Sequence, residues 1–330
     1  MDVDAYVVAR TAEWARLEEL AARRRLSGPE SDELVRLYQR AATSLSVVQS
    51  ASPDPALVGR LSSLVARARS AVTGAHTPAW RDLARFFAVV FPTAVWRARW
   101  WVAGAAGASA AVAVAAGAWV AADPTVAATI TPPEGVRQFR REFVDYYSEH
   151  PHGAFAFSVW TNNAWVAAQC LLTGISLLFP LWVLLQNALN VGVSGGLLAR
   201  EGGLGTFFSY ILPHGMLELT SIFVAAGAGL RLGWAWVAPG RRTRATALGV
   251  EGRAMAAVAL GLVPVFAVAG TIEGFVTPSG LWSPVKLAIG ALALGGFLAY
   301  VGVLGSRGAR AGETGDLLAD EGAAELPWAG

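Results

Sequence analysis

The chain has 330 residues, of which 54% are hydrophobic and only 15% are charged, and its mean hydropathy is +0.45. An ordinary soluble domain carries more charge, so this composition excludes that class and favours a protein folded in a bilayer. The net charge of +2 is small and the arginines alternate with acids at helical spacing, which excludes a nucleic-acid-binding stripe. A single cysteine, Cys170, excludes an intramolecular disulfide framework and a cysteine-based metal cluster.

Residues 1–77 have the pattern of soluble amphipathic helices. Apolar residues recur at helical spacing over residues 4–25, and the run Ser27–Glu30 then ends that helix and starts a second one, which continues to about residue 49. A third helix is expected over residues 55–74. The three helices can bury one shared apolar seam, so we expect a helical domain. No secretory signal peptide is visible, which predicts that this domain is cytosolic.

Residues 78–101 interleave aromatic side chains with arginines. Tryptophan concentrates at headgroup depth, and arginine prefers the anionic cytosolic leaflet. We therefore expect an interfacial amphipathic helix that leads into the first membrane span, with a fourth soluble helix as the alternative. The residues expected at the membrane interface are Arg81, Arg85, Trp96, Arg97, Arg99, Trp100 and Trp101.

Residues 102–305 predict an all-α, polytopic bundle of transmembrane helices. The run 102–122 is apolar throughout and long enough for a hydrocarbon core of roughly 30 Å, and its glycines, Gly104, Gly107 and Gly117, are expected to let a neighbouring helix approach closely. The run 153–199 is too long for one span and predicts two. Further spans are expected over residues 204–237, 254–276 and 285–304.

Arginine placement favours six spans with both termini in the cytosol. That count keeps the arginines of the loop at 241–253 on the same side as those before residue 100, whereas the alternative of five spans exports the loop. The segment 306–330 is rich in glycine, alanine and acids and is expected to be a disordered acidic tail.

Several ionisable and amide residues lie inside the predicted spans. Burying an ionisable group there costs at least about 2.5–3.5 kcal/mol, so such groups normally face protein or water and indicate function. His214 and Glu218 are four residues apart on one helix and share a face. The functional interpretation is that these residues line a polar pathway or a proton relay. The alternative is that they form structural hydrogen bonds between helices at the membrane edge. The expected intramembrane polar cluster consists of His214, Glu218, Glu273, Asn162, Asn163, Asn187 and Asn190.

Catalysis has no positive support in the sequence. The run from His214 to Glu218 lacks the second histidine of the His-Glu-x-x-His zinc-protease motif. For His150 and His152 a solvated loop is favoured over a weak surface metal site. The chain has no serine elbow, no phosphate-binding loop and no aspartate pair placed for intramembrane proteolysis. We expect no enzymatic activity, no catalytic residue, no cofactor and no metal site, and an intramembrane hydrolase is the least favoured alternative.

Four ordered motifs resemble those of the stage II sporulation protein M family, in its longer form with a soluble helical N-terminal region. They are Asn162-Asn163, residues 186–192, residues 213–218 and residues 272–278. The resemblance extends from about Phe91 onward, and Ala188 departs from it because the family often has glycine there. It implies a multi-pass protein of the bacterial cytoplasmic membrane with no established enzymatic activity.

The resemblance also implies a role and a set of partners. In spore formers the namesake is similar to a scaffold that assembles with two peptidoglycan-degrading partners during engulfment. Relatives in other bacteria tend to be encoded near an RDD-type membrane protein and a MoxR-type ATPase, which suggests assembly or transport. We expect a membrane scaffold whose partners are the lipid bilayer and other membrane proteins or a cytosolic ATPase, with a transporter or permease component as the alternative. Glycine-rich faces favour a homo-oligomer.

Overall fold

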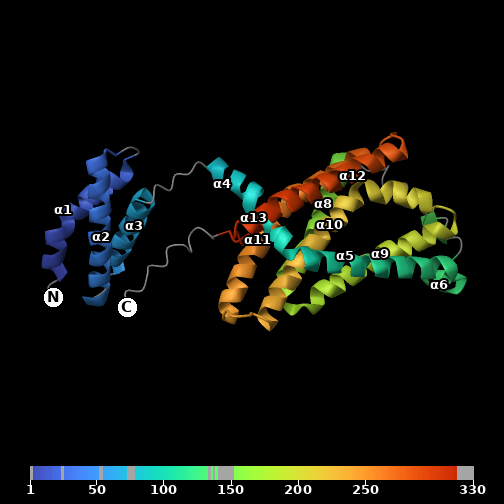
Figure 1. Ribbon diagram of the computed structural model, residues 1–330, viewed down its shortest axis with the longest axis horizontal. Helices are drawn as coiled ribbons and strands as arrows, with labels where there is room; N and C mark the ends of the chain where they lie inside the picture. Colours follow the sequence, from blue (N-terminus) through green and yellow to red (C-terminus); the bar gives the residue numbers. More distant parts are fainter. Residues whose placement is uncertain are drawn as a thin grey trace. The chain divides into compact units, whose positions relative to one another are not determined.

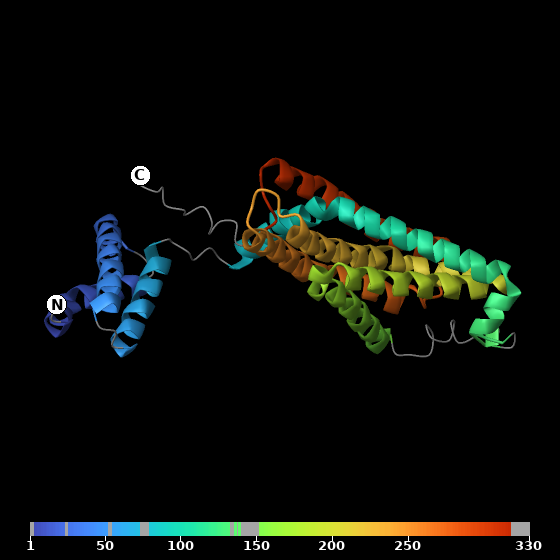
Figure 2. The same cartoon turned by 90° about the horizontal axis from the view of Figure 1, so that it is seen from below.

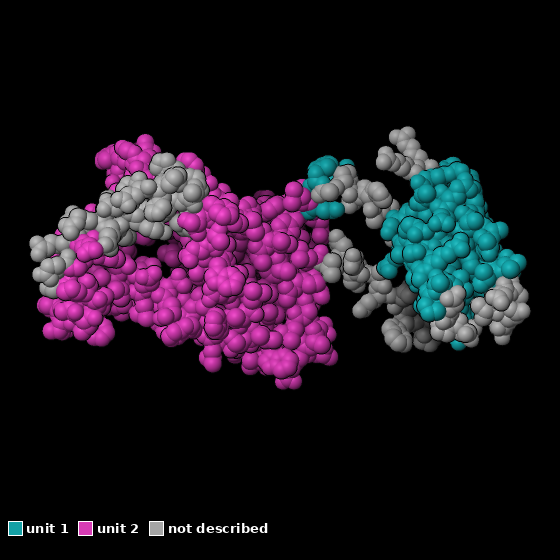
Figure 3. All heavy atoms as spheres, turned by 180° about the vertical axis from the view of Figure 1, so that it is seen from behind, with its two compact units in different colours: residues 1–82 teal, residues 83–330 magenta. Residues whose placement is uncertain are grey.

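Helices make up nearly all of the described part of the chain (Figure 1). The structure, a computed structural model, describes residues 3–23, 26–51, 55–72, 79–132, 135–136, 138–139 and 152–317. No strand occurs within those ranges, and the all-α prediction is confirmed. The chain divides into two compact units, unit 1 of residues 1–82 and unit 2 of residues 83–330 (Figure 3).

Unit 1 is a three-helix domain with its own core. Its helices are α1 (Val3–Ala22), α2 (Gly28–Ala51) and α3 (Pro55–Val72), close to the predicted bounds. Apolar residues at helical spacing face one another across all three helices, as the predicted shared seam requires. The buried core consists of Trp14, Leu17, Leu20, Leu34, Ala41, Val48, Leu61, Leu64 and Ala68.

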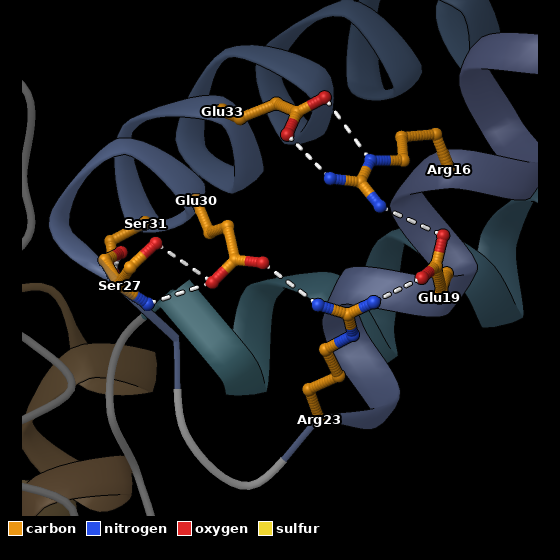
Figure 4. Close-up of polar contacts among 7 residues, drawn as sticks. All are labelled: Arg16, Glu19, Arg23, Ser27, Glu30, Ser31 and Glu33. Carbon is orange, nitrogen blue, oxygen red and sulfur yellow. Dashed lines mark hydrogen bonds and ion pairs between the residues drawn. The ribbon is translucent and has the colours of Figure 1, made fainter.

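Polar contacts fix the join between α1 and α2 (Figure 4). The backbone N–H and the hydroxyl of Ser27 both donate to the Glu30 carboxylate at 2.8 Å, and the first of these bonds is the glutamate half of a capping box at the start of α2. Arg16 of α1 donates to Glu19 on its own helix and, through two nitrogens at 3.2 and 2.9 Å, to Glu33 on α2. These bonds favour the ionised carboxylates, so the pKa of Glu33 is lowered by Arg16 and the pKa of Glu30 by Ser27.

Unit 2 is the helical bundle. The helix α4 (Ala79–Arg85) crosses the boundary of the units and continues through the π-helical turn η1 (Phe86–Val90) into α5. The helices that follow are α5 (Phe91–Ala122), α6 (Pro124–Ile130), α8 (His152–Leu172), α9 (Leu178–Arg200), α10 (Leu204–Val237), α11 (Arg244–Thr271), α12 (Ser283–Tyr300) and α13 (Ser306–Arg310). Short turns interrupt them, namely η2 (Gly174–Ser176), η3 (Ile272–Val276) and η4 (Val301–Gly305).

The centre of unit 2 is α10, which packs against α5, α8, α9, α11 and α12. Half of the residues of α10 are buried, whereas α5 and α12 leave much of their apolar surface exposed. Two views show α5 and α9 running side by side along the bundle (Figures 1 and 2). An apolar exterior around a buried central helix is the pattern of a protein solvated by lipid.

Five helical segments of the described chain are long and apolar enough to cross a membrane. They are Trp80–Ala122, Leu178–Arg200, Leu204–Val237, Arg244–Val276 and Ser283–Arg310, and they confirm the polytopic bundle. The sixth predicted crossing coincides with α8, which is helical and packs against α10 and α11 but is not one of the five. Its amide residues, including Asn162 and Asn163, lower its hydropathy.

The segment 78–101 differs from the interfacial helix that was expected. Its second half enters the bundle, and Phe91 is only 1% exposed. Gly261 of α11 faces the Phe91 ring where a side chain would collide with it, and the ring packs near Phe297 and Tyr300. The aromatic residues that suggested headgroup depth therefore include core residues, which composition alone does not distinguish.

The segment 306–330 also differs from the disordered tail that was expected. Residues 306–310 form α13, and Arg253 of α11 donates two hydrogen bonds of 2.6 Å to Asp316, which is 6% exposed. This contact could not be predicted from the sequence because the two residues are far apart in the chain. Residues 318–330 of the expected tail lie outside the described residues.

Glycines allow α5 and α9 to approach closely. A Cβ atom added to Gly196 would lie 2.6 Å from the carbonyl oxygen of Gly117, and one added to Gly117 would lie 2.9 Å from that of Gly192. Small residues serve this purpose where lipid-facing helices meet. Gly104 and Gly107 of α5 instead face open space.

Candidate functional site

Three ionisable side chains gather inside unit 2 where α10 meets the turn η3. His214 and Glu218 come from α10, and Glu273 comes from η3 at the end of α11. Their exposed fractions are 4%, 6% and 3%, and one nitrogen or oxygen atom from each lies within 4.8 Å of the others. The structure therefore brings together the three ionisable residues of the predicted cluster.

Local helix geometry puts these side chains in place. The four-residue spacing stacks His214 and Glu218 on one face of α10. Pro213 lies inside α10, and its carbonyl group faces Gly290 of α12 where only a glycine leaves room. Glu273 belongs to a π-helical turn, a geometry that is frequent at functional sites.

Hydrogen bonds reach the cluster from α8 and from the residue after η3. Asn163 of α8 donates its side-chain amide to Glu218 Oε1 at 2.5 Å. His214 Nδ1 lies 3.2 Å from the Thr277 hydroxyl oxygen, and His214 Nε2 lies 3.6 Å from Glu273 Oε1. Glu273 Oε2 is buried and has no hydrogen-bond partner among the described residues. A buried carboxylate oxygen without a partner is costly and calls for a physical explanation.

The other amides of the predicted cluster lie apart from this centre. Asn162 is exposed and lies at hydrogen-bond distance from the side chain of Asn163. Asn187 donates to the carbonyl oxygen of Val183 within α9, and Asn190 is exposed on the same helix. Sequence periodicity could not separate these amides from Asn163 because it does not say which helices are neighbours.

Two residues that the sequence analysis did not single out complete the surroundings. Lys286, the single lysine of the chain, is 9% exposed, donates to the Thr277 carbonyl oxygen at 2.6 Å and lies 5.8 Å from the Tyr210 ring. Thr277 faces His214 through its hydroxyl. The sequence did contain an indication of Lys286, because a lone lysine at the start of an apolar span marks a candidate functional residue.

The predicted interface residues lie on α4 and α5. The guanidinium of Arg99 lies over the rings of Trp96 and Trp100, at 4.7 and 5.5 Å, and Trp100 is 75% exposed. Trp101 instead packs against Trp234 of α10. The remaining three are Arg81, which is exposed, Arg97, which is half-buried, and Arg85, which pairs with Glu313 at 3.5 Å.

The fold and the buried cluster together define a polytopic α-helical membrane protein that carries a separate helical domain. The sequence profile described as stage II sporulation protein M matches residues 106–278, more than half of the chain. The chain therefore belongs to that family, and the matched region contains the whole ionisable cluster. A second profile, described as a domain of unknown function (DUF8413), matches residues 4–74. No curated protein and no solved structure matches the chain.

Proposed function

We propose that this protein is a membrane scaffold or assembly component in which the bundle is the anchor and unit 1 binds a partner. The observation that carries the proposal is that unit 1 has a core of its own, and is thus a discrete helical domain attached to membrane-spanning helices. Autonomous helical domains with charged exteriors are suited to protein recognition. Family membership supports the same role.

The surface of unit 1 offers a place for a partner. A hollow of about 520 Å³ on α1 and α2 is bordered by three arginines and one glutamate, Arg10, Arg36, Arg40 and Glu13. Its net positive charge favours an acidic segment of another protein, since complementary charge steers association. We infer that the partner is another membrane protein or a cytosolic ATPase, and that no enzymatic activity resides in this chain.

The proposed location is the bacterial cytoplasmic membrane, with unit 1 on the cytosolic side. The support is the arginine-rich segment that joins unit 1 to the bundle, because positively charged residues flanking spans favour the cytosol. Single cysteines introduced at position 60 of α3 and at position 201 test this orientation. The measurement compares their labelling by an impermeant reagent in intact cells and in lysed cells. Labelling of position 60 in intact cells by an impermeant reagent would contradict it.

The scaffold role is tested by cross-linking in the native membrane, followed by mass spectrometry. A photo-reactive residue at position 40, in the hollow, is compared with one at position 60, exposed on α3. We expect position 40 to cross-link to the same partner in the unchanged chain and in a Glu218→Gln, Glu273→Gln double variant. Position 60 should give little cross-linking. A chain found strictly alone in its membrane removes the basis of the proposal.

A second candidate function is a component of a transporter or permease. The buried cluster of His214, Glu218 and Glu273 favours it, because ionisable groups inside spans often line pathways for ions or protons. Solute flux into liposomes that disappears with Glu218→Gln would support it. Absence of flux for every solute tested, with the protein folded, would count against it.

A further inference from the structure

The described contacts of His214 place one ring nitrogen beside Thr277 and the other beside Glu273. The Thr277 hydroxyl oxygen lies 3.2 Å from His214 Nδ1 and 3.4 Å from the Ile272 carbonyl oxygen; when the hydroxyl donates to that carbonyl oxygen, its lone pair accepts from Nδ1–H. In that tautomer the lone pair of His214 lies on Nε2, which faces Glu273 Oε1 at 3.6 Å. Two electron-rich atoms then face each other inside the protein, which is unfavourable unless a positive species lies between them.

The second observation is the carboxylate of Glu273. Its side chain is only 4% exposed, yet Oε2 has no hydrogen-bond partner in the described part of the chain. Glu218 adds a second carboxylate within 4.8 Å of both groups. With a neutral imidazole, the cluster as ionised carries two negative charges in an apolar bundle, and a dication balances them.

We propose that His214, Glu218 and Glu273 bind a divalent transition-metal cation of the Zn²⁺ class. One imidazole nitrogen and two carboxylate oxygens are ligands that Zn²⁺ takes in sites that keep a further position open. The 3.6 Å between His214 Nε2 and Glu273 Oε1 is close to the roughly 3.4 Å that separates two tetrahedral ligands when each lies about 2.1 Å from the metal. The imidazole ligand disfavours Mg²⁺ and Ca²⁺, which prefer oxygen ligands alone.

The surroundings of the cluster have the form that metal sites require. The Thr277 hydroxyl orients the imidazole through Nδ1, and the Asn163 amide orients the Glu218 carboxylate. Lys286 lies at the rim, where the Thr277 carbonyl oxygen holds its ammonium group. The inference is independent of the proposed function, because a scaffold and a transporter could equally hold such a site.

Cobalt binding to the full-length protein tests the site. The protein is purified in detergent with a streptavidin-binding tag, because a polyhistidine tag would itself bind metal, and is then stripped with a chelator. We expect one Co²⁺ per chain, with visible absorption bands of a site that has low coordination number. Zn²⁺ should displace the Co²⁺ and Mg²⁺ should not.

Variants assign the bound metal to these residues. Glu273→Gln removes a ligand and should weaken Co²⁺ binding by at least about 100-fold, and Thr277→Val should weaken it about 10–100-fold through the histidine. The control variants are Glu201→Gln, in the exposed turn after α9, and the double change His150→Ala, His152→Ala, which removes two further histidines of the chain. Both should bind as the unchanged chain does.

Three outcomes would overturn the inference. They are no stoichiometric Co²⁺ binding by folded, unchanged protein; full binding by Glu273→Gln; and loss of binding in the His150, His152 control. If no stoichiometric Co²⁺ binds, a proton shared by His214 Nε2 and Glu273 Oε1 stabilises their contact instead of a metal ion. If Glu273→Gln does not fold, the stoichiometry of the unchanged chain and the affinity of Thr277→Val decide.

Discussion

At the scale of single residues, Asn163 holds the carboxylate of Glu218 from a neighbouring helix. Asn163→Leu leaves that buried carboxylate without its amide donor, so we expect the free energy of unfolding to fall by about 1–3 kcal/mol. The measurement is denaturant unfolding of the detergent-solubilised protein. Asn190→Leu, an exposed position on α9, is the matched control and should change stability little. Equal losses in both variants would contradict the assigned role.

Asp316 fastens the segment after α13 to α11 through the guanidinium of Arg253. Asp316→Asn removes the charge from a carboxylate that is almost fully buried, and should lower the midpoint of thermal unfolding by several degrees. The exchanged pair, Arg253→Asp with Asp316→Arg, should recover part of the loss. No recovery would mean that packing, rather than charge pairing, holds the segment.

At the scale of elements, the α5–α9 contact depends on backbone approach. Gly196→Ala places a Cβ atom against the Gly117 carbonyl oxygen, so the helices must separate, and we expect a loss of about 1–3 kcal/mol. Gly107→Ala, on the open face of α5, is the control and should be neutral or stabilising because alanine favours helix. Thermal unfolding in the same detergent compares the two variants. Similar losses would show that helix propensity, not packing, decides the result.

The α1–α2 pairing depends on ionised carboxylates. Because Arg16 lowers the pKa of Glu33 in the folded domain below the ordinary value of 4.5, this pair stabilises the domain above that pH. The stability is lost as the pH falls from about 4.5 through the lower, folded pKa. Glu33→Gln and Arg16→Gln should each flatten this pH dependence, and Arg60→Gln, an exposed control on α3, should not.

Hydrogen exchange of peptides from residues 3–72, corrected for intrinsic rates and followed from pH 6 to pH 3, measures this dependence. An unchanged profile in both Glu33→Gln and Arg16→Gln would contradict it.

At the scale of the whole molecule, the chain consists of a water-compatible domain and a lipid-compatible bundle. Because unit 1 has a complete apolar core within residues 14–68, residues 1–77 expressed alone should be soluble, helical by circular dichroism and cooperative in thermal unfolding. The same fragment carrying Leu17→Ala should lose most of that cooperativity, since Leu17 is fully buried. A non-cooperative transition of the unchanged fragment would show that unit 1 needs the bundle.

The sequence predicted what depends on local periodicity and on composition. It located the three helices of unit 1 and the apolar spans, and it singled out His214, Glu218 and Glu273 because charge inside an apolar run is rare. Contacts between distant segments could not be predicted from the sequence. They include the burial of Phe91 in the core, the pairing of Arg253 with Asp316, and the hydrogen bond from Asn163 to Glu218. The helical period fixes the face on which a side chain lies, but tertiary packing decides what covers that face.

The burial of Lys286 bears on how this molecule can be labelled. The single lysine of the 330 residues is nine-tenths buried and engaged with a backbone carbonyl, so amine-specific reagents find no exposed lysine on the folded chain. A lysine introduced at an exposed position of α1, α2 or α3 is therefore the one exposed lysine of that variant. Each such variant provides one lysine for a fluorophore or a surface attachment, besides the α-amino group of the N-terminus, and no native lysine has to be removed first.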